Sequence, residues 1–140
     1  MMYLLDTNVI SEESRRVPDP GVAAWFAAQT VDHSFLSIVT LAEVEQGILR
    51  LGKTKRAAEL TEFLLFVEAE YQGRILPIDR PVARTWSEIT ARAFRAGQPL
   101  GYADSWIAAT ALTHRLTVVT RNVADFQAAG VGIFNPWESP

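Results

Sequence analysis

Short apolar runs alternate with segments of helical periodicity along the chain, and this alternation limits the fold more than any other feature of the sequence. Strand-like runs occur at 2–5, 34–39, 75–78, 117–120 and near Ile133. Apolar residues three and four positions apart predict helices at 21–30, 41–51, 54–71, 81 to near Gly97, 102–114 and a short turn at 123–126. This order predicts an α/β fold with a central, mostly parallel sheet flanked by helices.

Glycine, proline and short polar stretches mark several expected boundaries. Gly52 is expected to close the helix that starts at Leu41. Pro77 favours an edge strand because proline cannot donate a hydrogen bond to a neighbouring strand, and Pro81 suits the first turn of a helix. The polar residues 6–8 are expected to form a loop after the first strand.

Length and composition fit one globular domain over residues 1–140. The chain is 49% hydrophobic and 21% charged, which argues against a disordered protein. The absence of cysteine excludes disulfides and thiolate metal sites and makes the cytoplasm the expected location, and no run is long enough to span a membrane. A net charge of −3 argues against nucleic-acid binding unless bound cations reverse the local charge.

Two aspartates stand where a carboxylate is unusual. Asp6 directly follows an apolar strand, where parallel sheets bind ligands, although a turn-forming Asp is an equal alternative. Asp104 shares a predicted helix face with Ile107 and Ala108. Burying an unpaired carboxylate costs roughly several kcal/mol, more than a helix dipole returns, so a bound cation is the favoured interpretation. The alternative is a partly solvated first-turn Asp.

Glu43 and Asp125 have structural explanations of their own. Thr40 and Glu43 match a capping box, with Thr40 as the N-cap. Asn122 is three residues before Asp125 and is a candidate cap for the turn at 123–126. All four acids nevertheless lie near predicted helix starts or strand ends, so they can converge on one side of the sheet. Oxygen ligands without cysteine or paired histidine favour Mg²⁺, which Mn²⁺ can replace.

Five ordered blocks carry a resemblance to a known family. They are LLDTNVISE at 4–12, SIVTLAEVEQGILRL at 37–51, ADSWIAATAL at 103–112, TRNVADF at 120–126 and NPW at 135–137. The chain resembles PIN-domain proteins, specifically the VapC and FitB toxins of bacterial toxin–antitoxin pairs. One departure is Trp106, which stands where the family usually has an aliphatic residue.

The resemblance implies a metal-dependent endoribonuclease with a PIN domain over 1–140. It implies that Asp6, Glu43, Asp104 and Asp125 form the acidic site, with Asp6 and Asp104 as the first-choice Mg²⁺ ligands. Supporting polar positions are Asn8, Thr120 and Asn122. The implied partners are RNA, a cognate antitoxin, a second copy of the chain in a homodimer, and DNA reached through the antitoxin.

Candidate RNA-binding residues are the cations Arg50, Lys53, Lys55, Arg56 and Arg121, although such a run is more often a solvated surface. Exposure of Trp86, Trp106 and the apolar run 63–67 is a further reason to expect a homodimer. The rival function is a catalytically silent PIN-like protein that acts through partner or nucleic-acid binding. The presence of all four acids argues against it.

Overall fold

A computed structural model describes residues 1–138 and shows a five-stranded sheet in the order β3-β2-β1-β4-β5, with every neighbouring pair parallel. The strands are β1 (Tyr3–Leu5), β2 (Ser34–Ser37), β3 (Ile75–Leu76), β4 (Thr117–Val119) and β5 (Ile133–Phe134). The predicted α/β class and parallel sheet are confirmed. Residues 139 and 140 of the predicted domain lie outside the described part, so its boundary at 140 stays a prediction.

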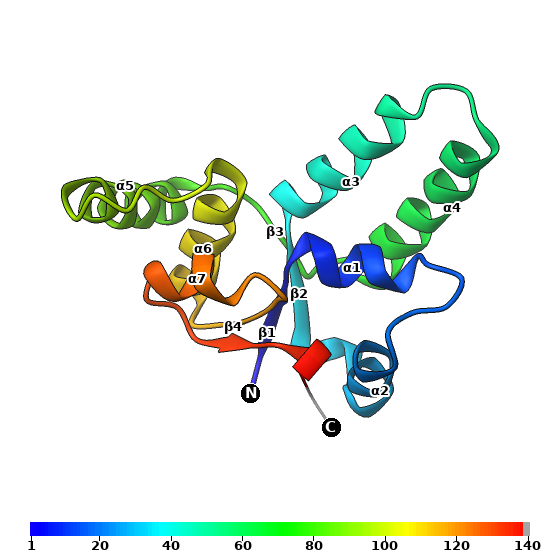
Figure 1. Cartoon of the computed structure of the whole chain (residues 1–140), viewed down its shortest axis with the longest axis horizontal. Helices are drawn as coiled ribbons and strands as arrows, with labels where there is room; N and C mark the ends of the chain where they lie inside the picture. Colours follow the sequence, from blue (N-terminus) through cyan, green and yellow to red (C-terminus); the bar gives the residue numbers. More distant parts are fainter. Residues whose placement is uncertain (139–140) are drawn as a thin grey trace.

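Seven α-helices connect and cover the strands in the described part of the chain (Figure 1). They are α1 (Thr7–Glu13), α2 (Pro20–Ala28), α3 (Ile38–Arg50), α4 (Lys55–Glu70), α5 (Arg80–Arg95), α6 (Tyr102–His114) and α7 (Val123–Ala128), with short 3-10 helices at Val31–His33 and Pro136–Glu138. None of these helices is both long and apolar enough to cross a lipid bilayer.

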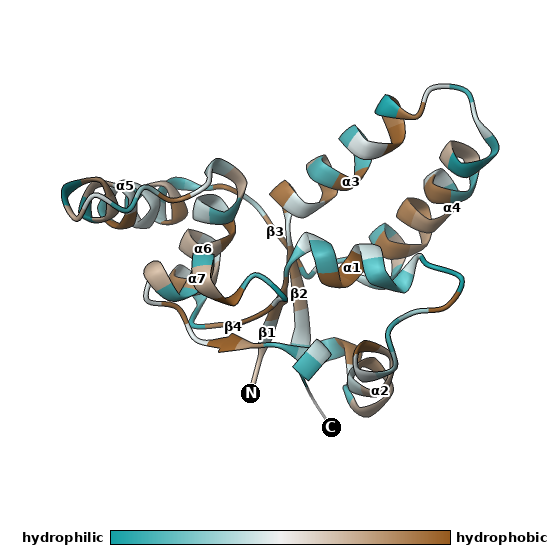
Figure 2. Ribbon diagram, viewed as in Figure 1, coloured by the Kyte–Doolittle hydropathy of each residue, from teal (hydrophilic) through white to brown (hydrophobic). Residues whose placement is uncertain are grey.

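The sheet separates two apolar cores, because successive side chains of a strand point to opposite faces. Leu4 packs with Val82 and Ile107 on the side covered by α5, α6 and α7, whereas its neighbour Leu5 packs with Ile10 and Val67 on the other side. In Figure 2 the hydrophobic colour gathers on the strands and on the helix sides that pack against them. Helices α3 and α4 form a hairpin that projects from the sheet (Figure 1).

Several expected boundaries are confirmed. Strand β3 is at the edge of the sheet and stops just before Pro77, and Pro81 lies in the first turn of α5. Gly52 follows the last turn of α3 with a φ of +63°, a backbone conformation that favours glycine. The loop predicted at 6–8 is wrong, because only Asp6 is non-helical and α1 begins at Thr7.

The expected capping of two helices is also wrong. Helix α3 begins at Ile38, and the Ser37 hydroxyl accepts a hydrogen bond from the Val39 amide, so Thr40 is inside the helix and forms no capping box with Glu43. The side chain of Asn122 makes no capping hydrogen bond to α7. Thr40 and Glu43 are instead bonded to Thr7, which lies more than thirty residues earlier in the sequence.

Candidate active site

The predicted site residues gather where the order of strands reverses. The chain passes from the central strand β1 to β2 and β3 on one side, and β4 then returns to pair with β1 on the other. Open parallel sheets bind ligands beyond the carboxyl ends of the strands at such a point. Asp6 follows β1 directly and Thr120 follows β4 directly, so both side chains stand at this position.

Asp6 is a buried carboxylate, only 2% exposed, held by three hydrogen bonds. Its Oδ1 accepts from the Thr7 amide at 2.8 Å, as the N-cap of α1. Its Oδ2 accepts from the Thr120 hydroxyl at 2.7 Å and from the Asn8 amide nitrogen at 3.3 Å. Loss of solvation raises the pKa of Asp6 despite the bonds from Thr120 and Thr7, and the charges of Glu43 and Asp125 raise it further.

Thr120 orients the two polar residues beside Asp6. While its hydroxyl donates to Asp6, its oxygen accepts from the Asn122 amide at 2.9 Å and lies 3.3 Å from the Asn8 side-chain nitrogen. One donated and two accepted bonds use the full capacity of a hydroxyl. Thr120 therefore acts as a polar residue of the site, in agreement with its expected supporting position.

Glu43 reaches the site from α3 through Thr7. The Thr7 hydroxyl lies 2.5 Å from Glu43 Oε1 and 3.2 Å from the hydroxyl of the fully buried Thr40. A hydroxyl has one proton, so the shorter distance assigns that proton to the carboxylate. Sequence reasoning gave Thr7 and Thr40 no place in the site, and no local pattern identifies a contact across more than thirty residues.

Asp104 and Asp125 complete the group from α6 and α7. Asp104 lies in the first turn of α6 and is partly buried, whereas Asp125 lies in the first turn of α7 and is exposed. Burial, followed by the charges of Asp6, Asp125 and Glu43, raises the pKa of Asp104 to about 6. The charges of Glu43 and Asp125 add to the raised pKa of both Asp6 and Asp104, so the four carboxylates lie near one another. None of them forms an ion pair within residues 1–138.

The acids are not preassembled into a metal cage. No three Asp, Glu or His side chains in the described residues lie close enough together to form a ready-made set of ligands. The donor set still suits a divalent cation, since it consists of carboxylate and hydroxyl oxygens, and Mg²⁺ usually keeps several waters between itself and the protein. A cation here would offset both the buried charge of Asp6 and the mutual repulsion of the acids.

The predicted RNA-binding cations separate into two groups. Arg56 and Arg121 line a groove of about 440 Å³ together with Thr7, Asn8 and Glu43. The Arg121 guanidinium also lies 4.8 Å from the centre of the Trp137 ring. Lys55 is next to Arg56 at the start of α4, whereas Arg50 and Lys53 are at the tip of the α3–α4 hairpin (Figure 1).

Trp106 packs beside the site and lines a pocket of about 340 Å³ together with Glu43. Its ring stacks on Trp86 with the centroids 4.4 Å apart, and Trp86 donates a hydrogen bond of 2.8 Å to the Ser105 hydroxyl. This pairing fixes the start of α6, the helix that carries Asp104.

Thr120→Val should destabilise the protein by about 1 to 3 kcal/mol, because it removes the hydroxyl that satisfies a buried carboxylate and leaves the Asn122 amide without its acceptor. Urea unfolding at pH 8 measures this loss. Thr120→Ser, which keeps the hydroxyl, should recover most of it. Equal unfolding midpoints for Thr120→Val and the unmodified protein would show that the hydroxyl has no orienting role.

Comparisons with known proteins agree with this arrangement. The family model described as PIN domain matches residues 3–131. VapC ribonuclease Y4jK of Sinorhizobium fredii is 41% identical over 98% of this chain and 99% of its own, and Toxin FitB of Neisseria gonorrhoeae is 43% identical over 97% and 99%. The crystal structure of FitAcB from Neisseria gonorrhoeae superposes with a TM-score of 0.92 at 43% identity, covering 98% of this chain and 99% of that one. The chain therefore belongs to the PIN-domain family, in the branch that contains VapC and FitB.

Proposed function

We propose that this protein is a divalent-metal-dependent endoribonuclease and the toxin of a type II toxin–antitoxin pair. The observation that carries the proposal is a buried carboxylate, Asp6, which shares the switch point of the sheet with three further acids and has no ion-pair partner among residues 1–138. Such a group of acids is unfavourable unless a cation binds there. The names of the relatives, VapC ribonuclease and Toxin FitB, support the same activity.

We assign the metal first to Asp6 and Asp104, and second to Glu43 and Asp125. Mg²⁺, or Mn²⁺ in its place, would activate a water and stabilise charge on the RNA phosphate. Thr120 and Asn8 hold the Asp6 carboxylate in one orientation, and Thr7 does the same for Glu43. The acids bind cations and are not themselves the nucleophile, so their ionised forms are the active ones.

The proposed partner is an antitoxin that brings the toxin to DNA. Two structures of similar chains are named FitAB bound to an IR36 DNA fragment, at 41% identity and a TM-score of 0.92, and VapBC-5, a member of the VapBC family of toxin–antitoxin systems, at 28% and 0.70. Val44, Leu60 and Phe63 give the groove beside Glu43 an apolar wall for an antitoxin segment. We propose that the protein acts in the cytoplasm, where its proposed RNA substrates are found.

The activity is tested with purified protein that has been freed of any partner. We expect mixed RNAs to be cut when Mg²⁺ or Mn²⁺ is present and to stay intact in EDTA. A catalytically silent PIN-like protein would instead bind RNA or a partner without cutting RNA under either condition. Cleavage that persists in EDTA would remove the metal from the mechanism and contradict the proposal.

We also propose a homodimer, supported by exposed apolar residues on α4 and α5 and no longer by the two tryptophans. Trp86 and Trp106 are occupied by each other and only partly exposed, so they are poor evidence for an interface. Leu65 and Phe66 on α4 are 62% and 59% exposed, and Phe94 on α5 is 79% exposed. We expect sedimentation at micromolar concentration to give twice the chain mass of 15.5 kDa, and a species of 15.5 kDa alone would count against the dimer.

A further inference from the structure

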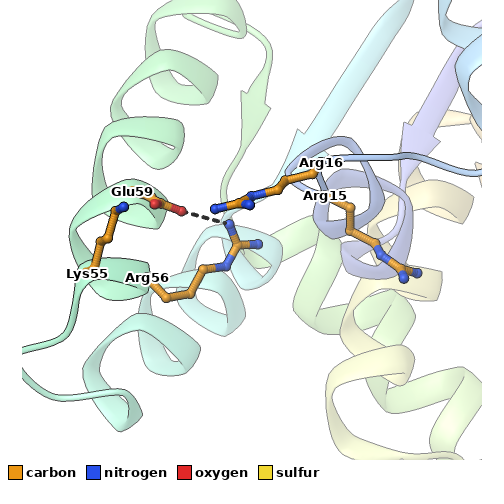
Figure 3. Close-up of a pocket in the computed structure, with 5 residues that line it drawn as sticks. All are labelled: Arg15, Arg16, Lys55, Arg56 and Glu59. Atoms are coloured by element: carbon orange, nitrogen blue, oxygen red, sulfur yellow. Dashed lines mark hydrogen bonds and ion pairs between the residues drawn. The ribbon is translucent and has the colours of Figure 1, made fainter.

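A concentration of positive charge lies beside the groove that leads to the acids. Four cations, Arg15, Arg16, Lys55 and Arg56, line a pocket of about 400 Å³ with one carboxylate, Glu59 (Figure 3). We call these four residues the basic cluster. The chain as a whole carries −3, so this excess of positive charge is local. Arg15 and Arg16 come from the loop after α1, and Lys55 and Arg56 come from the first turn of α4.

Neighbouring groups leave much of this charge free. Arg56 pairs with Glu59 at 3.4 Å and also reaches the Ser14 carbonyl at 3.4 Å, so it connects α4 to the end of α1. Arg16 and Lys55 form no ion pair within the described residues. Figure 3 shows Arg16 and Arg56 extending toward each other from the two elements. Two guanidinium groups that converge in this way repel each other, and the one carboxylate of the pocket, Glu59, offsets only part of this charge, so a further anion is favoured there.

Glu12 anchors the loop that carries Arg15 and Arg16. Glu12 is only 6% exposed, accepts a hydrogen bond from the Asp19 amide at 2.8 Å and pairs with Arg15 at 3.4 Å. Arg56 fixes the other side of the same loop through Ser14. The loop and the side chains of Arg15 and Arg56 are therefore held in place before any ligand arrives, which lowers the entropy lost on binding.

The basic cluster is continuous with the acidic site. Arg15 and Arg56 line both the 400 Å³ pocket and the 440 Å³ groove, and the groove is also lined by Thr7, Asn8 and Glu43. Phe63 and Leu60 line the same groove and offer apolar surface for bases. A single strand with one phosphate at the acids would thus run along the groove and bring a neighbouring phosphate to the arginines.

We propose that the basic cluster binds a backbone phosphate of the RNA substrate, a short distance along the strand from the phosphate that is cut. This inference rests on the proposed ribonuclease function and adds the path of the RNA to it. Guanidinium groups suit phosphate because they donate in a planar fork, and contacts of this kind position a strand without reading its sequence. Lys55 is the first residue of α4, and the positive end of that helix dipole also attracts the phosphate.

The test compares two pairs of substitutions with the same loss of charge. Arg16→Gln with Lys55→Gln removes the two cations that form no ion pair, and Arg92→Gln with Arg95→Gln removes two exposed cations in the last turn of α5. Both pairs are made in an Asp104→Asn background so that RNA is not cut. Binding of a fluorescein-labelled single-stranded RNA is measured by anisotropy over a series of salt concentrations.

We expect the basic-cluster pair to bind RNA about tenfold more weakly at low salt, and the dependence of log K on log salt to flatten by about 0.7, the value for one lost phosphate contact on a single strand. The α5 pair should change binding less than about twofold. Equal affinities and slopes for the two pairs would overturn the proposal. A basic-cluster pair that keeps RNA binding but loses binding to a polyglutamate peptide would also overturn it and would assign the cluster to an acidic protein partner.

Failure of the ribonuclease function and failure of this inference give different results. In the cleavage-competent protein, the basic-cluster pair should raise KM for a long RNA and leave kcat unchanged. If the unmodified protein cuts no RNA but the anisotropy difference remains, the ribonuclease proposal fails while the phosphate site stands. If RNA is cut and the two pairs have the same KM, the path along the basic cluster is wrong.

Discussion

Asp6→Asn or Asp104→Asn should lower RNA cleavage by roughly a thousandfold or more, equivalent to about 4 kcal/mol of transition-state stabilisation. Each replacement keeps the shape of the side chain and removes one of the two charges assigned to the metal. For Asp6, asparagine still offers one oxygen to the Thr7 amide or the Thr120 hydroxyl, so the fold is expected to persist. Initial rates on a labelled RNA at saturating Mg²⁺ measure the loss.

Glu45→Gln provides a matched control for these variants. Glu45 lies on α3 two residues from Glu43 but is exposed and makes no hydrogen bond or ion pair within residues 1–138. Its removal changes the net charge by the same amount and should leave cleavage within about twofold. Full activity in both Asp variants would show that the acids are not the reactive centre.

The second large effect concerns stability without metal. The pKa of Asp104 is about 6 in the folded protein and 3.8 for an ordinary aspartate, so the folded state binds a proton more tightly than the unfolded state does. The stability that this preference contributes is complete below pH 4 and is lost as the pH rises through 6. At pH 8, Asp104→Asn should therefore raise the free energy of unfolding by about 1 to 2 kcal/mol. The increase is smaller than the pKa shift alone would give, because Asp104 is partly exposed and solvent screens its charge.

Glu13→Gln is the matched control for this prediction, because Glu13 also has a raised pKa but lies away from the acidic site. Burial and the charge of Glu70 raise the pKa of Glu13 to about 7, so its contribution is lost between about pH 4.5 and 7. Glu13 lines a different pocket, with Phe26 and Tyr71. Both variants should melt higher than the unmodified protein in EDTA at pH 8, and Mg²⁺ should narrow the difference only for Asp104→Asn, since that metal stabilises the unmodified site. A lower melting temperature for metal-free Asp104→Asn would make Asp104 a structural residue.

Local sequence patterns predicted most strands and helices, because apolar spacing and proline positions over a few residues determine them. Alternating apolar runs gave the strands, Pro77 gave the edge position of β3, and the spacing at 102–114 gave α6 with its true ends. Helix α1 was missed because its seven residues are too few to establish a period, and its N-cap Asp6 also fits a turn. The signal that could have found it was Asp6 followed by the apolar pair Val9 and Ile10.

The hydrogen bonds that connect the candidate site residues could not be predicted from the sequence. Thr120 and Asp6 are hydrogen-bonded across 114 positions, and Thr7 reaches Glu43 across 36, so no short pattern reveals either contact. The pattern Thr40 to Glu43 resembles a capping box, but both side chains are bonded to Thr7 instead. Arg15 and Arg16 were overlooked for the same reason, since they meet Lys55 and Arg56 only after α1 and α4 have packed together.

A single Mg²⁺ titration tests the central claim that the acids bind the metal that cuts RNA. Cleavage rate and melting temperature are measured on the same partner-free preparation, starting from EDTA, for the unmodified protein and for Asp6→Asn. We predict that both quantities follow one saturation curve in the unmodified protein, and that neither follows it in the variant. Cleavage that is already complete in EDTA, or that rises equally in Asp6→Asn, would contradict the account.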